Sequence, residues 1–566
     1  MSETNSSPEL TIDLRPAEKV MHLPRMGSMH QTRLSFMRAL LRRLSTEKWR
    51  VERPVWRIDD AGVGTAVYCA HGPIRSYSLV CFANDLPPEK RSDRVIATEW
   101  DATFTLFDGV PDEADLERLS QNVPKQEAGR VSEKELSLSR ANRSVRLFEH
   151  VVERLAAGQQ PDVAKIAGVG YLMRTTAVYG SGKFGAADRA KIADRPEFQS
   201  SFHMEMLSVW LTRAFTTDIA EHLAKTRAPK TAVAFDKEIR RKLGVGNSTG
   251  LGMAPFLINH PVLLHAWMAA REEALARVRS QPTVSSEQID MFHHTLQSAY
   301  ANAGEWNTAD ERQAARVVQL RHDLEAIEAK LDAGVFDQPH PWNDLIEWAQ
   351  STLSLEGQEM MVTLVLEPNG DLIDDLATEM HADEGALFSI DGTMPCGQMR
   401  EILKSKYGWA LETDFDAPDA CARFWYVSEE KLEPRLGERA EEEGADLESP
   451  LAIGRDAKRL AHDLAAEPDD TPLAMFALNH PEHRHVLRRA QIAAQLPYAE
   501  IRSNLIASDM LAIDLLRCKL AFFGATKFDP RSDRWVRINM FQGAPFPDEF
   551  SDREADDWSF PVLGAE

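Results

Sequence analysis

The chain has 566 residues, with 65 Lys and Arg against 88 Asp and Glu, which gives a formal net charge of −23 at pH 7. A protein specialised for nucleic acid needs a basic face to neutralise phosphates, so this balance excludes that class. Hydrophobic residues make up 43% of the sequence, and no apolar run approaches the roughly 20 residues that span a bilayer. We therefore expect a globular protein of several domains with neither a nucleic-acid nor a membrane partner.

Cysteine content and the N-terminal sequence indicate the compartment. The five cysteines are scattered and include no CxxC pair, so they do not form a disulfide framework. The N-terminal residues are rich in acidic side chains and lack the apolar segment of a secretory signal. We predict a cytoplasmic protein whose residues 1–30 form a flexible tail.

A basic segment follows at residues 31–57. Apolar residues recur there at helical spacing, and basic residues outnumber acidic ones, which predicts a basic amphipathic helix. One interpretation is a contact with an acidic partner, a membrane surface or RNA. The other, which we favour, is a helix that packs on the acidic body of the protein itself.

Residues 55–108 are predicted to form an antiparallel β-meander. Two runs rich in β-branched and aromatic residues, GTAVYCA and SYSLVCFA, flank His71-Gly72-Pro73, a pattern typical of a hairpin. A third run ends at Asp108-Gly109. With the basic segment, these strands give a predicted domain over residues 31–110.

Helical periodicity dominates residues 111–350, which we predict to be the main domain and to form a homo-oligomer interface. Residues 351–566 are predicted to be a mixed α/β region, in which MVTLVLEPNGDLI (361–373) and RWVRINMF (534–541) are strands and 431–470 is an acidic solvated segment. The predicted fold class is α+β, predominantly α-helical, with a small antiparallel β-meander near the N-terminus and a mixed α/β C-terminal part.

The first candidate site is the glycine-rich stretch over residues 174–185. Its three glycines, serine and lysine in GSGKFG can turn backbone N–H groups around a phosphate or carboxylate, and Lys183 adds positive charge. The Walker A spacing is absent, and GSGKFG matches GxGxxG without the second strand and acidic residue of a dinucleotide fold. Tyr179 and Lys183 have the spacing of a Tyr-x-x-x-Lys pair, in which lysine makes the phenol a stronger acid. A purely structural turn is the alternative.

A second glycine-rich stretch covers residues 244–255. Its four glycines permit close approach of the backbone, and its uncharged polar side chains offer hydrogen bonds, although a tight crossing of two helices would use the same residues. If both stretches converge in space, a small anionic molecule is the expected ligand. The predicted catalytic residues are Tyr179 and Lys183, and the predicted binding residues are Arg174, Thr175, Thr176, Ser181, Asn247, Ser248 and Thr249.

Histidines give a different kind of candidate. The segment NHPEHRH contains His480, His483 and His485, and one ExxH step is formed by Glu482 and His485. A dimetal carboxylate bundle needs a second such step, and the chain has no HExxH. The metal alternative combines Asp218, His222, His480 and His485, whereas the favoured interpretation is that these histidines are satisfied at helix ends or on the surface.

These observations favour an enzyme that binds a small anionic metabolite or a phosphate-bearing cofactor, although no motif identifies the cofactor or the reaction. In this hypothesis the two glycine-rich stretches bind the ligand, and tyrosine, lysine and arginine assist proton transfer. Two alternatives stay open. One is a non-catalytic assembly or regulatory protein that uses helical interfaces, and the other is a metal-dependent hydrolase or oxygenase.

Overall fold

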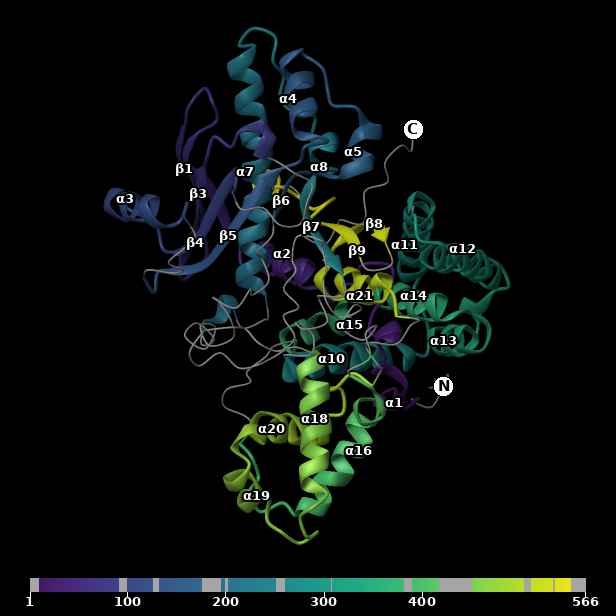
Figure 1. Ribbon diagram of the computed structural model, residues 1–566. Coiled ribbons are helices and arrows are strands. Elements are labelled where there is room, and N and C mark those ends of the chain that lie inside the picture. The colour runs from purple at the N-terminus through teal and green to yellow at the C-terminus, as the bar shows by residue number, and fades with distance from the viewer. Residues whose placement is uncertain are drawn as a thin grey trace.

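The structure is a computed structural model. It describes residues 10–90, 99–125, 132–175, 195–198, 202–250, 260–306, 308–380, 389–415, 417, 450–502, 510–532 and 535–550. Its described part is mainly helical, and the helices surround one mixed sheet (Figure 1).

Nine strands form this sheet, in the order β1-β2-β3-β4-β5-β6-β7-β9-β8. They are β1 (Arg50–Ile58), β2 (Gly64–His71), β3 (Ser76–Ala83), β4 (Ala102–Asp108), β5 (Glu135–Arg143), β6 (Tyr171–Thr175), β7 (Gly244–Gly250), β8 (Thr526–Ser532) and β9 (Trp535–Met540). β6 and β7 pair in parallel, and the other neighbours in this sheet pair antiparallel.

Helices connect and cover the strands. They are α1 (Ala17–Val20), α2 (Phe36–Thr46), α3 (Glu113–Asn122), α4 (Phe148–Ala156), α5 (Val163–Val169), α7 (His203–Arg227), α8 (Lys237–Arg241), α10 (Pro261–Arg279), α11 (Ser286–Glu305), α12 (Glu311–Asp332), α13 (Pro341–Thr352), α14 (Leu355–Leu366), α15 (Gly370–Ile373), α16 (Cys396–Glu412), α18 (Pro450–Leu464), α19 (Leu473–Asn479), α20 (Arg484–Gln495) and α21 (Ala512–Cys518). Ser285 and Gln288 close a capping box at the start of α11, as their spacing favours.

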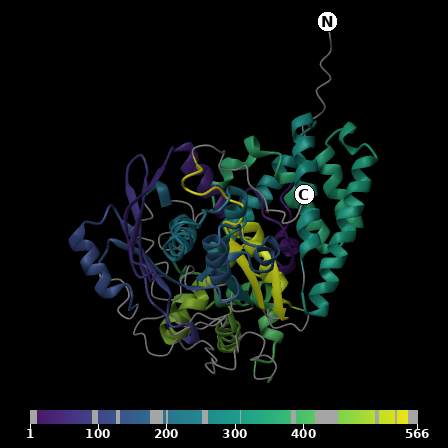
Figure 2. The same cartoon turned by 90° about the horizontal axis from the view of Figure 1, so that it is seen from above.

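The sheet has two differently covered faces. On its inner face α7 places Phe215 against Phe104 of β4, with the ring centroids 5.5 Å apart. On its outer face Leu116 and Leu119 of α3 pack in a small separate core with side chains of β2 to β5. Figure 2 shows β1 to β5 curving along one side of the molecule, with α3 outside them and α11 and α12 on the opposite side.

The predicted arrangement of the fold is wrong. The hairpin strands are present as β2 and β3, but they belong to a sheet that also takes β5, β6 and β7 from the predicted helical domain and β8 and β9 from the C-terminal region. The N-terminal strands are therefore not a small separate meander, and the C-terminal part is not an independent α/β unit. Pairing between distant segments decides this arrangement, and local sequence patterns do not report it.

A second correction concerns residues 361–373. They do not form a strand and a tight turn, because α14 covers Leu355–Leu366 and α15 covers Gly370–Ile373. Almost every residue of α14 is buried, so its sequence shows the continuous apolar run of a buried strand rather than helical periodicity. The predicted strand at 534–541 corresponds to β9.

The basic segment packs on the protein itself, as we favoured. Arg38 of α2 forms a buried ion pair with Glu367, and Arg33 donates from Nε to Oδ1 of Asp374 at 2.7 Å. The preceding residues also contribute to the core, since Val20 is fully buried in the segment predicted as a tail. α2 is thus an internal element rather than a free basic surface.

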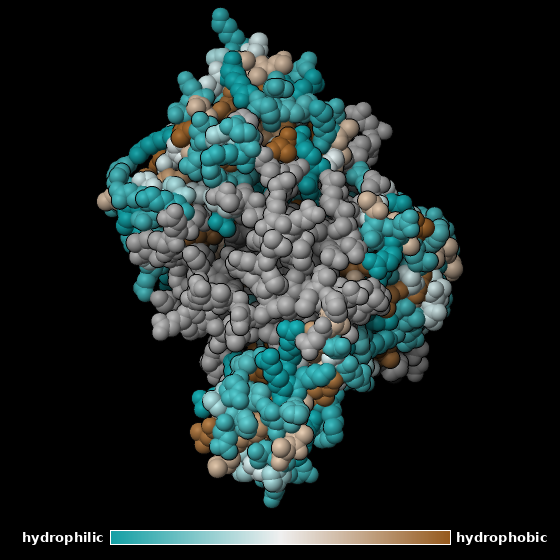
Figure 3. Space-filling model, viewed as in Figure 1, coloured by the Kyte–Doolittle hydropathy of each residue, from teal (hydrophilic) through white to brown (hydrophobic). Residues whose placement is uncertain are grey.

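On the face shown in Figure 3, the described residues are mostly hydrophilic, with apolar side chains in small, separated patches. Among the helices that the structure describes, none combines the length and apolar character needed to cross a membrane. The helices α16, α18, α19 and α20 form a lobe at one end of the molecule (Figure 1).

Candidate functional site

The two glycine-rich stretches leave the sheet at one edge. β6 and β7 are adjacent and parallel, with Arg174 paired to Gly246. Parallel strands end at the same edge of a sheet, which is where open α/β sheets bind ligands. α7 lies between the two strands in sequence and contacts both, so β6, α7 and β7 form a βαβ unit.

Of the predicted site residues, Arg174 and Thr175 are the last two of β6. Both are buried, with 4% and 2% of their surface exposed. The Thr175 hydroxyl donates to the backbone carbonyl of Arg140 at 3.1 Å. Thr175 therefore joins β6 to β5 and does not present its hydroxyl proton to a ligand.

The other predicted binding residues divide into two groups. Asn247 pairs with Ile538, and because successive strand residues face opposite sides, it lies on the sheet face opposite to that of Gly246 and Arg174. The backbones of Ser248 and Thr249 pair with β9. The remaining four predicted residues lie outside the residues that the structure describes: Thr176, Tyr179, Ser181 and Lys183.

Arg140 of β5 shares a sheet face with Arg174, although sequence reasoning missed it. Asn142 pairs with Arg174, and Arg140 lies two residues before Asn142 on the same strand, so the three side chains share the outer face. The Arg140 guanidinium carbon lies 4.0 Å from the ring centroid of Trp100. Its Nε is buried without a hydrogen bond, burial lowers its pKa, and it forms no ion pair with the described residues.

A third arginine follows on β9. Gly246 pairs with Asn539, and Arg537 lies two residues before Asn539, so Arg537 shares this face as well. Between the arginines, a Cβ on Gly246 would lie 2.5 Å from Cγ of Tyr171, which explains why glycine is needed there. Apolar and polar residues alternate in ELSLSRANR (135–143), which favours a strand there and is the signal for β5. The helical periodicity of residues 111–350 predicted a helical domain that includes this segment.

The dinucleotide fingerprint is not met. A parallel strand does follow the glycine-rich stretch, after α7, but β7 has the sequence GVGNSTG and carries no acidic residue that could bind a ribose.

Asp218 and His222 line a cavity of about 530 Å³ beside α7. Asp218 accepts hydrogen bonds from the Tyr68 hydroxyl at 2.7 Å and from Arg53 at 2.6 Å. His222 contacts Trp56 Nε1 through Nδ1 at 3.4 Å and the Asp59 carbonyl through Nε2 at 2.9 Å. Both ring nitrogens are therefore occupied by protein groups.

The same cavity contains two groups with raised pKa values. Burial, followed by the charge of Asp218, raises the pKa of Tyr68 well above its usual range. Burial also raises the pKa of Glu221, which accepts a hydrogen bond from the Phe235 backbone. These groups form a neutral or paired network around α7 rather than a set of free metal ligands.

A larger cavity of about 800 Å³ lies between α2, α11 and the residues before α15. Its arginines, Arg33 and Arg38, are paired with carboxylates. The Asn369 side-chain oxygen accepts from Gln281 at 2.6 Å and from Gln288 at 2.7 Å. These arginines and amides of the cavity are thus bound by other protein groups.

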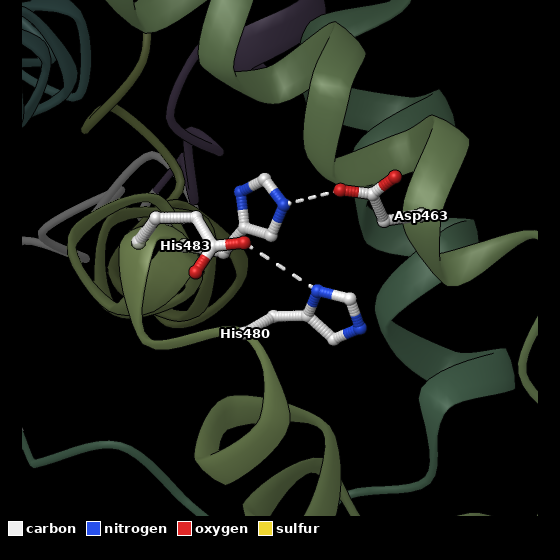
Figure 4. Close-up of side chains that lie close together, drawn as sticks. Asp463, His480 and His483 are labelled. Atoms are coloured by element: carbon white, nitrogen blue, oxygen red, sulfur yellow. Dashed lines mark hydrogen bonds and ion pairs between the residues drawn. The ribbon is translucent and has the colours of Figure 1, made fainter.

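The predicted metal alternative does not form as proposed. α7, with Asp218 and His222, packs on the sheet, whereas His480 and His485 lie in the helical lobe (Figure 1). His485 binds Asp456, with 2.9 Å between Nε2 and Oδ2. His480 instead lies near His483 and Asp463 (Figure 4).

Comparisons with known proteins give no further assignment. No family model matches the chain, and no curated protein or solved structure is significantly similar to it.

Proposed function

We propose that the protein is an enzyme that binds a small anionic metabolite or a phosphate-bearing cofactor at the sheet edge where β6 and β7 end. Arg140 is the observation that carries the proposal. Its guanidinium is half-buried, stacks on Trp100 and has no ion pair among the described residues. A cation withdrawn from water without a counter-charge is unfavourable, and a bound anion would supply that charge.

The surroundings of Arg140 support an anion rather than a neutral ligand. Arg174 occupies the neighbouring strand on the same face, and two guanidinium groups can bind one phosphate or carboxylate with paired hydrogen bonds. The proposal therefore places anion recognition on Arg140 and Arg174.

Catalysis is assigned to the segment that follows β6. Tyr179 is the proposed proton donor, and Lys183 is its electrostatic partner. Backbone N–H groups of the glycine-rich stretches would orient the ligand. The cysteine usage supports a cytoplasmic location for this enzyme.

The assembly alternative has less support. It relied on the basic residues of 31–57 as a partner surface, and several of these arginines already pair within the protein, including Arg38 with Glu367. The paired groups are not available to an acidic partner without a loss of internal contacts.

Arg140→Met tests the proposal. Methionine keeps an apolar contact with Trp100 but removes the cation, so we expect an unchanged melting temperature without anions. In the wild type, inorganic phosphate, pyrophosphate or citrate at about 100 times its Kd should stabilise the fold by about 2.7 kcal/mol. This stabilisation should be lost in Arg140→Met, as measured by thermal unfolding with each anion titrated separately.

Arg50→Met is the matched control, because Arg50 is an exposed arginine on β1 at the far edge of the sheet. It should keep the full response to the anion. Equal responses in wild type and Arg140→Met would refute anion binding at this edge. Lys183→Ala then separates binding from catalysis, since it should retain part of the stabilisation by anions.

A further inference from the structure

Two histidines and two carboxylates meet in the helical lobe, away from the sheet edge. His480, Glu482 and His483 come from the turn between α19 and α20, and Asp463 comes from the last turn of α18 (Figure 4). One ligand-type atom from each of the four side chains lies within 4.8 Å of the other three. The α18 helix and the α19–α20 turn thus present one combined set of donors.

The local sequence explains this arrangement. Pro481 starts the short helical turn Pro481–His483, and its fixed backbone angle favours the first position of such a turn. The His483 amide donates to the His480 carbonyl at 3.2 Å, which brings the two histidines to the same side. Their rings both stack on Phe476, at centroid distances of 4.6 Å for His480 and 5.9 Å for His483.

The four side chains divide into an anchored and an open half. His483 Nε2 lies 2.7 Å from Asp463 Oδ2, and the His483 side chain is only 5% exposed. His480 Nδ1 lies 3.5 Å from Glu482 Oε1, and the Glu482 side chain is 61% exposed. The anchored half is held in place by packing, and the open half gives an ion access from solvent.

We infer that this cluster, formed by Asp463, His480, Glu482 and His483, binds a divalent transition-metal ion of the zinc class. Two imidazole nitrogens and two carboxylate oxygens are donors that Zn²⁺ accepts in tetrahedral sites. Around such an ion, ligand atoms at about 2.1 Å from the metal lie about 3.4 Å from one another. The observed separations, from 2.7 Å to within 4.8 Å, bracket that value.

Binding requires only small adjustments of side chains. The hydrogen bond between His483 and Asp463 must open by about 0.7 Å, and the most distant donors must close by up to about 1.4 Å. The exposed Glu482 carboxylate and the exposed side of His480 can supply this movement without a change in the helices. The ion would then cross-link α18 to the α19–α20 turn.

The test titrates the metal-free full-length chain with Zn²⁺ by calorimetry, and with Co²⁺ while the visible absorption of a tetrahedral site is recorded. His480→Gln should weaken the affinity of this site by at least about 10-fold, because even groups that only orient ligands contribute that much. Asp463→Asn should weaken it similarly, since it removes the charge but retains the size of the side chain.

His485→Gln is the matched control. This histidine lies in the same segment and is exposed, but it pairs with Asp456 outside the cluster. Its affinity for Zn²⁺ should stay within about 2-fold of the wild type. Absence of saturable binding in the wild type, or equal affinities in His480→Gln and His485→Gln, would overturn the inference. Circular dichroism in EDTA verifies that each variant is folded.

Discussion

Lys519 places an amine inside the protein. Its side chain is 1% exposed, and Nζ lies 4.6 Å from the ring centroid of Phe523. Burial lowers the pKa of Lys519 to about 7, whereas an unfolded chain keeps it near 10.5. The unfolded state therefore binds more protons than the folded state between these two values, and this group makes stability rise with pH across that window.

Lys519→Met is expected to remove this dependence. Methionine has no charge to bury, so the variant should be more stable than the wild type below pH 7, by at most about 4–5 kcal/mol. The difference should shrink as the pH rises from 7 and should vanish near 10.5. Urea unfolding at several pH values measures it, and a difference that is constant with pH would contradict a buried, titrating amine.

Individual site residues were predictable only where a local pattern marked them. Arg174 was found because a glycine-rich stretch follows it, whereas Arg140 lies in β5, which looked like part of a helical domain. His480 and His483 were visible in NHPEHRH, but their partner Asp463 comes from α18 and no spacing in the sequence links them. Local sequence patterns therefore cannot predict a site whose residues come from separate elements.

At the scale of elements, a buried ion cluster joins the N-terminal segment to two helices. Glu359 of α14 accepts from Arg15 and Arg25, each at 3.2 Å, and also pairs with Arg271 of α10. Burial, followed by the charge of Arg15, lowers the pKa of Arg271 to about 9.

Glu359→Gln should destabilise the fold by about 3–5 kcal/mol, because it leaves buried guanidinium groups without a counter-charge. The free energy of unfolding in urea is the measurement. Glu347→Gln is the control, since Glu347 is exposed and 3.7 Å from Arg279, and it should cost less than about 1 kcal/mol. Equal effects of the two variants would show that the cluster contributes no more than a surface pair.

The elements themselves were predictable where their periodicity was clear. α12 follows an apolar stripe in the sequence, as expected of a helix with one packed side. α7 and α10 were also recognised from apolar residues at helical spacing, although most of their residues are buried in the fold. α14 was mistaken for a strand because it is buried on all sides. β7 was missed because GVGNSTG has no strand propensity, and it becomes a strand through pairing with β6 and β9.

At the scale of the whole molecule, residues on the two sides of the predicted domain boundary near residue 350 contact one another. β7 pairs with β9, and the fully buried Arg213 of α7 donates to the Ala544 carbonyl at 2.7 Å. Arg38 of α2 pairs with Glu367 across the same boundary. The two sides of this boundary share one core.

A fragment of residues 1–350 should therefore not fold stably. We expect trypsin to degrade it at least about 10-fold faster than the full chain, since cleavage follows the population of open states. Co-expression with residues 351–566 should restore resistance if the two parts reassemble. A cooperative thermal transition of the fragment alone would instead support the boundary near residue 350.

The position of β9 has a consequence for synthesis of the chain. During translation β7 is made long before β9, its antiparallel partner at Trp535–Met540. Until then the N–H and C=O groups along that edge of β7 have no strand to pair with, and such edges favour aggregation. Completion of the sheet therefore waits until β8 and β9 have been synthesised, long after β7. Slow elongation through residues 251–540 would lengthen the period in which a chaperone is needed.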